Sequence, residues 1–158
     1  SVMAVLAMPI GAAYAIDHPP MKEGLWQIRL QTISNPDGKK SESTMKVCRD
    51  HAFDKSTEAM ATKMAGCTTI DDSLSGGVYS NEMRCKMGGS VVSTKTTFVY
   101  KGDTAVHSDT HVTYIPAMYG MGDQTVIEDQ AYLSSCPAGM KPGDLLSPDG
   151  TVQHSHGH

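Results

Sequence analysis

Three histidines near the end of the chain are the residues best suited to metal chemistry. His154, His156 and His158 form an H-x-H-x-H terminus. Imidazole is a good ligand for Cu²⁺, Ni²⁺ and Zn²⁺, so a flexible terminus of this kind can wrap around one ion. Because a chain end has no preformed geometry, we expect modest affinity; a solubilising terminus is the simpler interpretation, with metal binding as the alternative. Copper or zinc at these histidines is the only cofactor that the sequence suggests.

A second group, His107, Asp109 and His111, alternates along the chain, so a strand would place all three on one face. At ~3.3 Å per residue the two histidine Cα atoms would lie ~13 Å apart, too far to share one ion without help from a neighbouring strand. A solvated polar face is the simpler interpretation, with a metal or acid–base site as the alternative.

Acidic pairs are also present, at Asp71-Asp72 and Glu128-Asp129. Neighbouring residues of a strand point to opposite faces, so neither pair forms a paired-carboxylate site. No Ser/His/Asp set is evident from the spacing. The sequence therefore favours a protein that is not an enzyme.

The cysteines are Cys48, Cys67, Cys85 and Cys136, and no two of them have the C-x-x-C spacing of zinc or redox motifs. An even number in an exported chain indicates two disulfides, for which three pairings are possible. We predict Cys67–Cys85, which bracket two neighbouring strands, and Cys48–Cys136, which would join the start of a helix to the end of the last strand. Free cysteines in a reducing cytosol are the alternative.

Export is indicated by residues 1–15. Val2 to Ile10 are uncharged and mostly apolar, and Ala13-Tyr14-Ala15 has the A-x-A pattern of a cleavage site. We interpret this segment as a signal peptide truncated at its start, with a retained membrane anchor as the alternative. The expected location is the periplasm or the exterior, with no transmembrane span in the mature chain.

Composition limits the remaining possibilities. The chain has 158 residues, and 13 Lys+Arg against 17 Asp+Glu give a net charge of −4, which argues against binding nucleic acid. The 15 Gly and 8 Pro interrupt the chain too often for a helical bundle. One domain with a core of its own is expected.

Period-two alternation is the main structural signal, beginning with Trp26, Ile28 and Leu30 on one face of a strand. The pattern recurs between turn signals rich in glycine, which predicts a mainly β protein. We expect an antiparallel meander of about seven to eight strands, curled into a barrel or a strongly bent sheet. The predicted strands are 25–33, 43–48, 68–74, 78–86, 91–100, 105–114 and 124–133.

One short helix is expected between Cys48 and Cys67, with Asp50 as its N-cap. Its buried face would consist of Phe53, Thr57, Met60 and Met64, which have helical spacing. On the strand before it, Met45 and Val47 are expected to point inward.

The sequence also predicts two irregular segments. Residues 114–122 are expected to form an apolar loop that either contacts a small apolar ligand or a partner protein, or folds onto its own core. The residues that carry this expectation are Tyr114, Ile115, Met118, Tyr119 and Met121. Residues 137–158 are rich in Pro and Gly, and we expect an extended, mobile tail beyond a disulfide-linked β domain of residues 16–136.

The segment Met21-Lys22-Glu23-Gly24-Leu25-Trp26 resembles the "MKPGLWE" opening of a widespread, uncharacterised family of small bacterial envelope proteins. The four cysteines follow that family's layout, and Cys136-Pro137-Ala138-Gly139-Met140 resembles its usual ending. The chain departs from the pattern at Glu23, where Pro is usual, and at Gln27, where Glu is usual. The resemblance covers residues 20–142 and implies a secreted, disulfide-linked β domain, but no chemistry.

Together these observations predict a non-catalytic periplasmic or secreted domain that binds a small apolar ligand or a partner protein. Two alternatives remain: an envelope protein that binds copper through its histidine terminus, and a structural or accessory subunit of a larger surface assembly.

Overall fold

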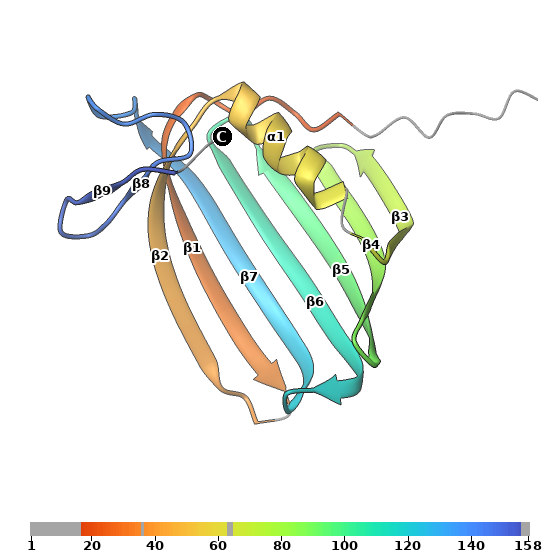
Figure 1. The fold of residues 1–158 in the computed structure, drawn as a ribbon. Helices are drawn as coiled ribbons and strands as arrows, with labels where there is room; N and C mark the ends of the chain where they lie inside the picture. The colour runs from red at the N-terminus through yellow and green to blue at the C-terminus, as the bar shows by residue number, and fades with distance from the viewer. Residues whose placement is uncertain (1–16, 36, 63–64, 156–158) are drawn as a thin grey trace, which may run out of the picture.

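The computed structural model describes residues 17–35, 37–62 and 65–155, and within them the chain forms a single antiparallel sheet and one helix (Figure 1). The sheet order is β3-β4-β5-β6-β7-β1-β2-β8-β9. The two ends of this order are not paired with each other, so the sheet is curled but not closed. The strands are β1 (Gly24–Asn35), β2 (Lys40–Arg49), β3 (Cys67–Ser75), β4 (Val78–Met87), β5 (Ser90–Lys101), β6 (Ala105–Met118), β7 (Met121–Ser134), β8 (Leu145–Leu146) and β9 (Val152–Gln153), and the helix is α1 (His51–Thr62).

The predicted mainly β fold, with seven long strands and a short helix after Cys48, is therefore confirmed. The β1–β2 hairpin joins the meander through β1, which pairs antiparallel with β7. We call the face on which α1 and residues 17–23 pack the inner face, and the opposite face the outer face. Trp26 on β1 and Val47 on β2 are register partners on the inner face, as the alternation predicts.

The main core lies on the inner face at the end of the sheet that carries α1. Trp26 is completely buried, and Met21, Val47 and Val106 are buried around it. The indole Nε1 of Trp26 donates a hydrogen bond to the carbonyl oxygen of Lys22 at 2.8 Å. Partly buried rings and chains complete the cluster, namely Ile28, Phe53, Phe98, Tyr100, Tyr132 and Leu145.

Helix α1 begins as predicted, because the Asp50 carboxylate accepts a hydrogen bond from the Phe53 amide at 2.7 Å. Its buried face is shorter than predicted. Phe53 packs on the core, but Thr57 is exposed and 71% of Met60 is exposed. The prediction that these two residues are buried is wrong, because only the first turn of α1 reaches the core; Met64 lies outside the described residues. Met45 lies on the inner face as predicted, opposite Ile28 on β1, but 41% of it is exposed.

Both predicted disulfides are confirmed. Cys67 and Cys85 are register partners on β3 and β4, and Cys48 on β2 is bonded to Cys136. The two links close chain separations of 18 and 88 residues. By the loop-entropy estimate they stabilise the fold by about 3 and 4–5 kcal/mol.

The C-terminal segment differs from the expected extended tail. Residues 137–155 fold back on the sheet, where β8 pairs with β2 and β9 pairs with β8. Met140 is buried in a second cluster with Leu25 and Cys48. This packing follows from the Cys48–Cys136 disulfide, which holds the start of the segment against β2, and two-residue strands are too short to give a periodic signal.

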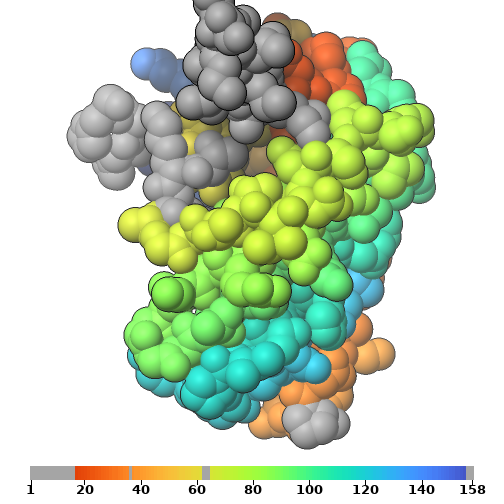
Figure 2. Space-filling model, turned by 90° about the vertical axis from the view of Figure 1, so that its right-hand side faces the viewer, coloured from red at the N-terminus to blue at the C-terminus, as the bar shows by residue number. Residues whose placement is uncertain are grey.

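The sheet has an exposed edge at β3, which lies at the surface in Figure 2. The β3–β4 register shifts between Thr69 and Asp71, so Ile70 lies at an irregularity, and Asp71 and Asp72 follow it. Irregular register and charge are features that discourage pairing with another strand. The irregular register and the charges of β3 therefore give no support to an assembly in which this edge pairs with a strand of another chain. Within the described residues, no helix has the length and apolar character needed to cross a membrane.

Gly24 is the position where the backbone depends most clearly on glycine. Its φ is +150°, and a Cβ there would lie 2.4 Å from the carbonyl oxygen of Ser134 and 2.6 Å from the ring of Tyr132. We expect Gly24→Ala to lower the free energy of unfolding by about 2–4 kcal/mol, because the chain must shift away from β7. Chemical denaturation followed by Trp26 fluorescence measures the effect. Gly89→Ala is the control, since its Cβ would meet nothing within 4 Å, and equal losses in the two variants would contradict this account.

Candidate functional site

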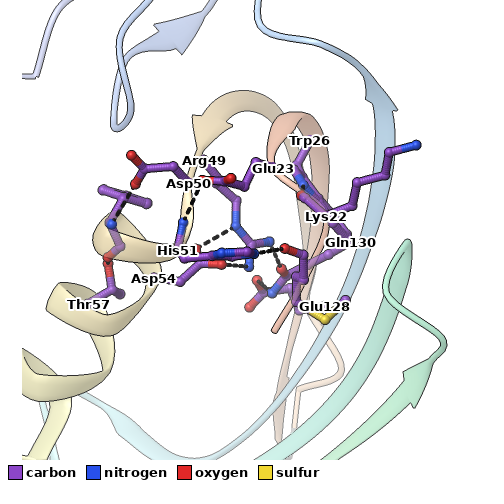
Figure 3. A network of polar contacts seen from close by, with 12 residues as sticks. Lys22, Glu23, Trp26, Arg49, Asp50, His51, Asp54, Thr57, Glu128 and Gln130 are labelled. Carbon is purple, nitrogen blue, oxygen red and sulfur yellow. Dashed lines mark hydrogen bonds and ion pairs between the residues drawn. The ribbon is translucent and has the colours of Figure 1, made fainter. Parts of the chain in front are cut away.

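Arg49, at the end of β2, is the centre of a polar network on the inner face (Figure 3). Its Nε and Nη2 donate to the two carboxylate oxygens of Asp54 on α1, at 2.9 and 3.1 Å. Its Nη1 donates to Oε1 of Gln130 on β7 at 2.6 Å. The guanidinium carbon also lies 4.6 Å from the ring centre of Trp26. One side chain therefore connects the helix, the sheet and the core.

Glu128 continues this network along β7. The Gln130 Nε2 donates to Oε1 of Glu128 at 2.8 Å. Burial raises the pKa of the Glu128 carboxyl above its usual value, while the bond from Gln130 and the charge of Arg49 act in the opposite direction.

The second carboxylate oxygen of Glu128, Oε2, has no hydrogen-bond partner among the described residues. In that part of the chain no buried side-chain nitrogen or oxygen lacks a partner. Because Oε2 lacks one, it is not among the fully buried atoms, and it is at least partly exposed to solvent.

Beyond Glu128, away from α1, the inner face carries no charge across five strands. Two rows of register partners cross β1, β7, β6, β5 and β4 there, and all ten side chains are half-buried. We call these rows the neutral floor. It consists of Thr32, Val126, Thr110, Thr96 and Asn81 in the first row and Ser34, Gln124, Val112, Thr94 and Met83 in the second.

The first row of the neutral floor ends on β3 at Asp72, the register partner of Asn81. This carboxylate is engaged at the edge of the sheet, where it accepts a hydrogen bond from the Tyr79 hydroxyl. Figure 1 shows α1 lying at the opposite end of the sheet from the turns that close β1, β6 and β7.

The outer face of the same strands is densely charged. His107 bonds Asp129 through Nδ1 at 2.6 Å and Asp109 through Nε2 at 2.9 Å. The bond to Asp129 is the main cause that raises the pKa of His107. His111 lies farther along, 4.0 Å from Asp123. The predicted sharing of one face by these histidines is thus confirmed, and the face is the solvated polar one.

The predicted apolar loop is mostly strand. β6 extends to Met118 and β7 begins at Met121, so only Tyr119 and Gly120 form the turn. The prediction of an irregular segment over 114–122 is wrong, because regular pairing resumes at Met118–Met121 after a register shift. Tyr119 is 91% exposed and Ile115 is 65% exposed, while Tyr114, Met118 and Met121 are half-buried.

Of the three terminal histidines, only His154 lies in the described part of the chain. Its Nδ1 is 2.8 Å from Oδ2 of Asp144, a buried carboxylate that also accepts the Lys141 and Ser155 amides. The Lys141 amide is the main cause that lowers the pKa of Asp144. His154 therefore helps to fasten the C-terminal hairpin. His156 and His158 lie outside the described residues, so the metal site stays a prediction.

Two hollows in the surface lie away from the neutral floor. One of about 330 Å³ lies beside the Cys48–Cys136 disulfide and is lined by Gly24, Cys48, Arg49, Cys136 and Met140 among others. A smaller one of about 170 Å³ lies against the β1–β2 hairpin, between Ile33 and Lys40. No group of three His, Cys, Asp or Glu side chains in the described ranges could hold a metal ion.

Sequence reasoning missed Arg49 and Glu128 as members of one site. The signal was present, because both fall at inward positions of the period-two pattern. Arg49 follows Val47 by two residues, and Glu128 lies between Val126 and Gln130 on the same face. A charged residue at an inward position needs a partner, but the sequence does not reveal which strand supplies it.

The protein family described as "Protein of unknown function (DUF3617)" matches residues 21–136 of the chain. That range begins at the Met21 opening segment and ends at Cys136. No curated protein matches the chain.

Arg49→Met should lower the free energy of unfolding by about 3 kcal/mol, because it leaves the Asp54 carboxylate unpaired in a site where the side chains are 13% and 18% exposed. Arg29→Met is the matched control. It breaks the Arg29–Glu42 pair on the outer face, whose side chains are 52% and 50% exposed, and should cost less than about 1 kcal/mol. Urea denaturation measures both, and a loss at Arg49 no larger than that at Arg29 would show that the network does not stabilise the fold.

Proposed function

Because the chain belongs to the DUF3617 family, whose function is unknown, we propose a function from the inner face alone: a non-catalytic domain that binds a small apolar ligand on the neutral floor. The observation that carries this proposal is the segregation of charge. On β1, β5, β6 and β7, the side chains near this end of the sheet that carry charge, namely Arg29, Lys95, Asp109, His111 and Asp123, all lie on the outer face.

The composition of the neutral floor suits an uncharged, apolar surface. Val126, Val112 and Met83 are apolar, and the threonines add methyl groups. The hydroxyls of Thr96 and Thr110 bond each other at 3.0 Å, so these two residues offer less unsatisfied polarity to a ligand. An apolar ligand would gain about 25 cal/mol for each Å² of apolar surface removed from water.

The shape of the sheet favours an elongated ligand. The sheet is curled but open, and the ten side chains of the floor are half-buried rather than enclosed. A molecule on such a surface gains most when it extends along the rows and contacts several strands at once.

The proposed location is the periplasm or the exterior of the cell. Its support is the pair of disulfides, because such bonds form and persist in oxidising compartments and are rare in the cytosol.

A charge placed on the neutral floor tests the ligand proposal. Thr96→Lys should weaken binding of Nile red, an uncharged apolar dye, at least tenfold, because an ammonium group is costly to desolvate against the dye. Thr97→Lys is the matched control: Thr97 is next to Thr96 on β5 but faces outward, so dye binding should be unchanged. Fluorescence titration measures both. Equal dye affinity in the two variants, or no binding by the wild type, would sink the proposal.

A partner protein is the second candidate, and a separate observation favours it. Tyr119 has a φ of +52°, which costs a non-glycine residue about 1–2 kcal/mol, yet the residue is 91% exposed and gains little from burial. Ile115 and its register partner Val91 are also exposed on the outer face near this turn. Exposed apolar residues grouped in this way are typical of interaction surfaces.

Site-specific photo-crosslinking in intact cells tests this second candidate. A photoreactive residue at position 119 should give one discrete adduct, which Ile115→Ser should weaken severalfold because it removes an apolar contact. The same photoreactive residue at position 95, an exposed outer-face position in mid-strand, is the control and should give no such adduct. Equal adducts at positions 119 and 95 would contradict a specific surface at the turn.

A further inference from the structure

We propose that Glu128 binds an amino head group at the end of the neutral floor, so that the ligand of this protein is a cationic amphiphile. This inference rests on the proposed function, because the apolar chain of such a ligand would lie on the floor. Beyond the proposed function, this inference names the chemical class of the ligand's head group and the residue that selects that head group.

The position of Glu128 is the first argument. Its register partners are Leu30 on β1 and Ser108 on β6. The next inner-face row away from α1 is the first row of the neutral floor, which includes Val126 two residues earlier on β7. Glu128 therefore stands at the boundary between the covered core and the uncharged rows, where the head of a chain lying on the floor would arrive.

The free oxygen of Glu128 is the second argument. Oε1 is held by Gln130, and that bond fixes the orientation of the carboxylate (Figure 3). Oε2 has no partner among the described residues and is accessible. A carboxylate oxygen that is oriented but unused is an acceptor for an N–H or O–H donor of a ligand.

The balance of charge is the third argument and selects an amine. Arg49 and Asp54 form a two-bond ion pair, so the charge of Arg49 acts on Glu128 only from a distance. The contact between this pair and Glu128 passes through Gln130, a neutral amide, so Glu128 has no cation in direct contact in the part of the chain that the structure describes. A half-buried carboxylate without a counter-ion is costly, and an ammonium group would remove that cost.

The same balance excludes an anionic head group. Arg49 is engaged by Asp54, by Gln130 and by the face of the Trp26 ring, so its charge is committed to the network. A fatty acid would bring its carboxylate against that of Glu128, and two like charges at close range repel each other. An alcohol could donate one hydrogen bond to Oε2 but would bring no positive charge into contact with the carboxylate.

Three ten-carbon chains that differ only in the head group test the inference: decylamine, decanol and decanoate, each below its micelle concentration, as competitors of Nile red. For the wild type we expect decylamine to compete about tenfold more strongly than decanol, and decanoate to be the weakest. In Glu128→Gln, which keeps an acceptor for Gln130, we expect decylamine to fall to the level of decanol while decanol is unchanged. Thermal unfolding of both proteins checks that the variant is folded.

Asp129→Asn is the matched control, because Asp129 is the next residue and its carboxylate lies on the outer face with His107. It removes one negative charge from the protein and should leave the preference for decylamine intact. Loss of the preference in Asp129→Asn would mean general attraction to an acidic protein and would overturn the inference. If decanol binds but Glu128→Gln keeps the amine preference, the inference fails and the proposed function stands. If none of the three chains competes, both fail.

Discussion

The burial of Trp26 is the constraint on which the rest of the structure depends. One face of an open sheet must be covered before the sheet is stable, and the described residues provide one short helix to cover it. The indole provides a large apolar surface at one point of the inner face, and the segment before it folds back so that Lys22 accepts the indole hydrogen bond and Met21 packs beside the ring. Gly24 makes this return possible, because a side chain there would collide with the backbone of β7.

From that core the inner face divides into two parts with different physical roles. At the end with α1, Arg49 stacks on Trp26 and bonds both α1 and β7, so the position of the helix is fixed by charge as well as by packing. Glu128 is the last member of this network. Beyond it the side chains become neutral and the helix no longer covers them. The boundary between the stabilising part of the face and the proposed binding part is thus a single carboxylate.

Much of the fold could be predicted from the sequence, because period-two alternation is a local signal. The alternation of Trp26, Ile28 and Leu30 locates β1 and its inner face, and the cysteines at the helix boundaries allow both disulfides to be paired correctly. The predictions that failed depend on tertiary context. Helical spacing predicts that Met60 is buried, but it cannot show that only the first turn of the helix reaches the core. The Arg49–Gln130 contact joins residues 81 positions apart, and no local pattern contains it.

The residue types of the neutral floor differ from those that this chain has on its solvent-exposed outer face. On the outer face of β6 and β7, histidine and aspartate side chains form hydrogen-bonded pairs, and the face is well solvated. If the floor had only to remain soluble, the same residue types would suit it, and charged side chains would raise solubility. Threonine, valine and methionine at these positions give up that solubility, which supports the proposal that an apolar chain lies on this surface. The Trp26 core at the end that carries α1 and the two disulfides hold the sheet in its curled shape, so the neutral floor does not need the helix to cover it.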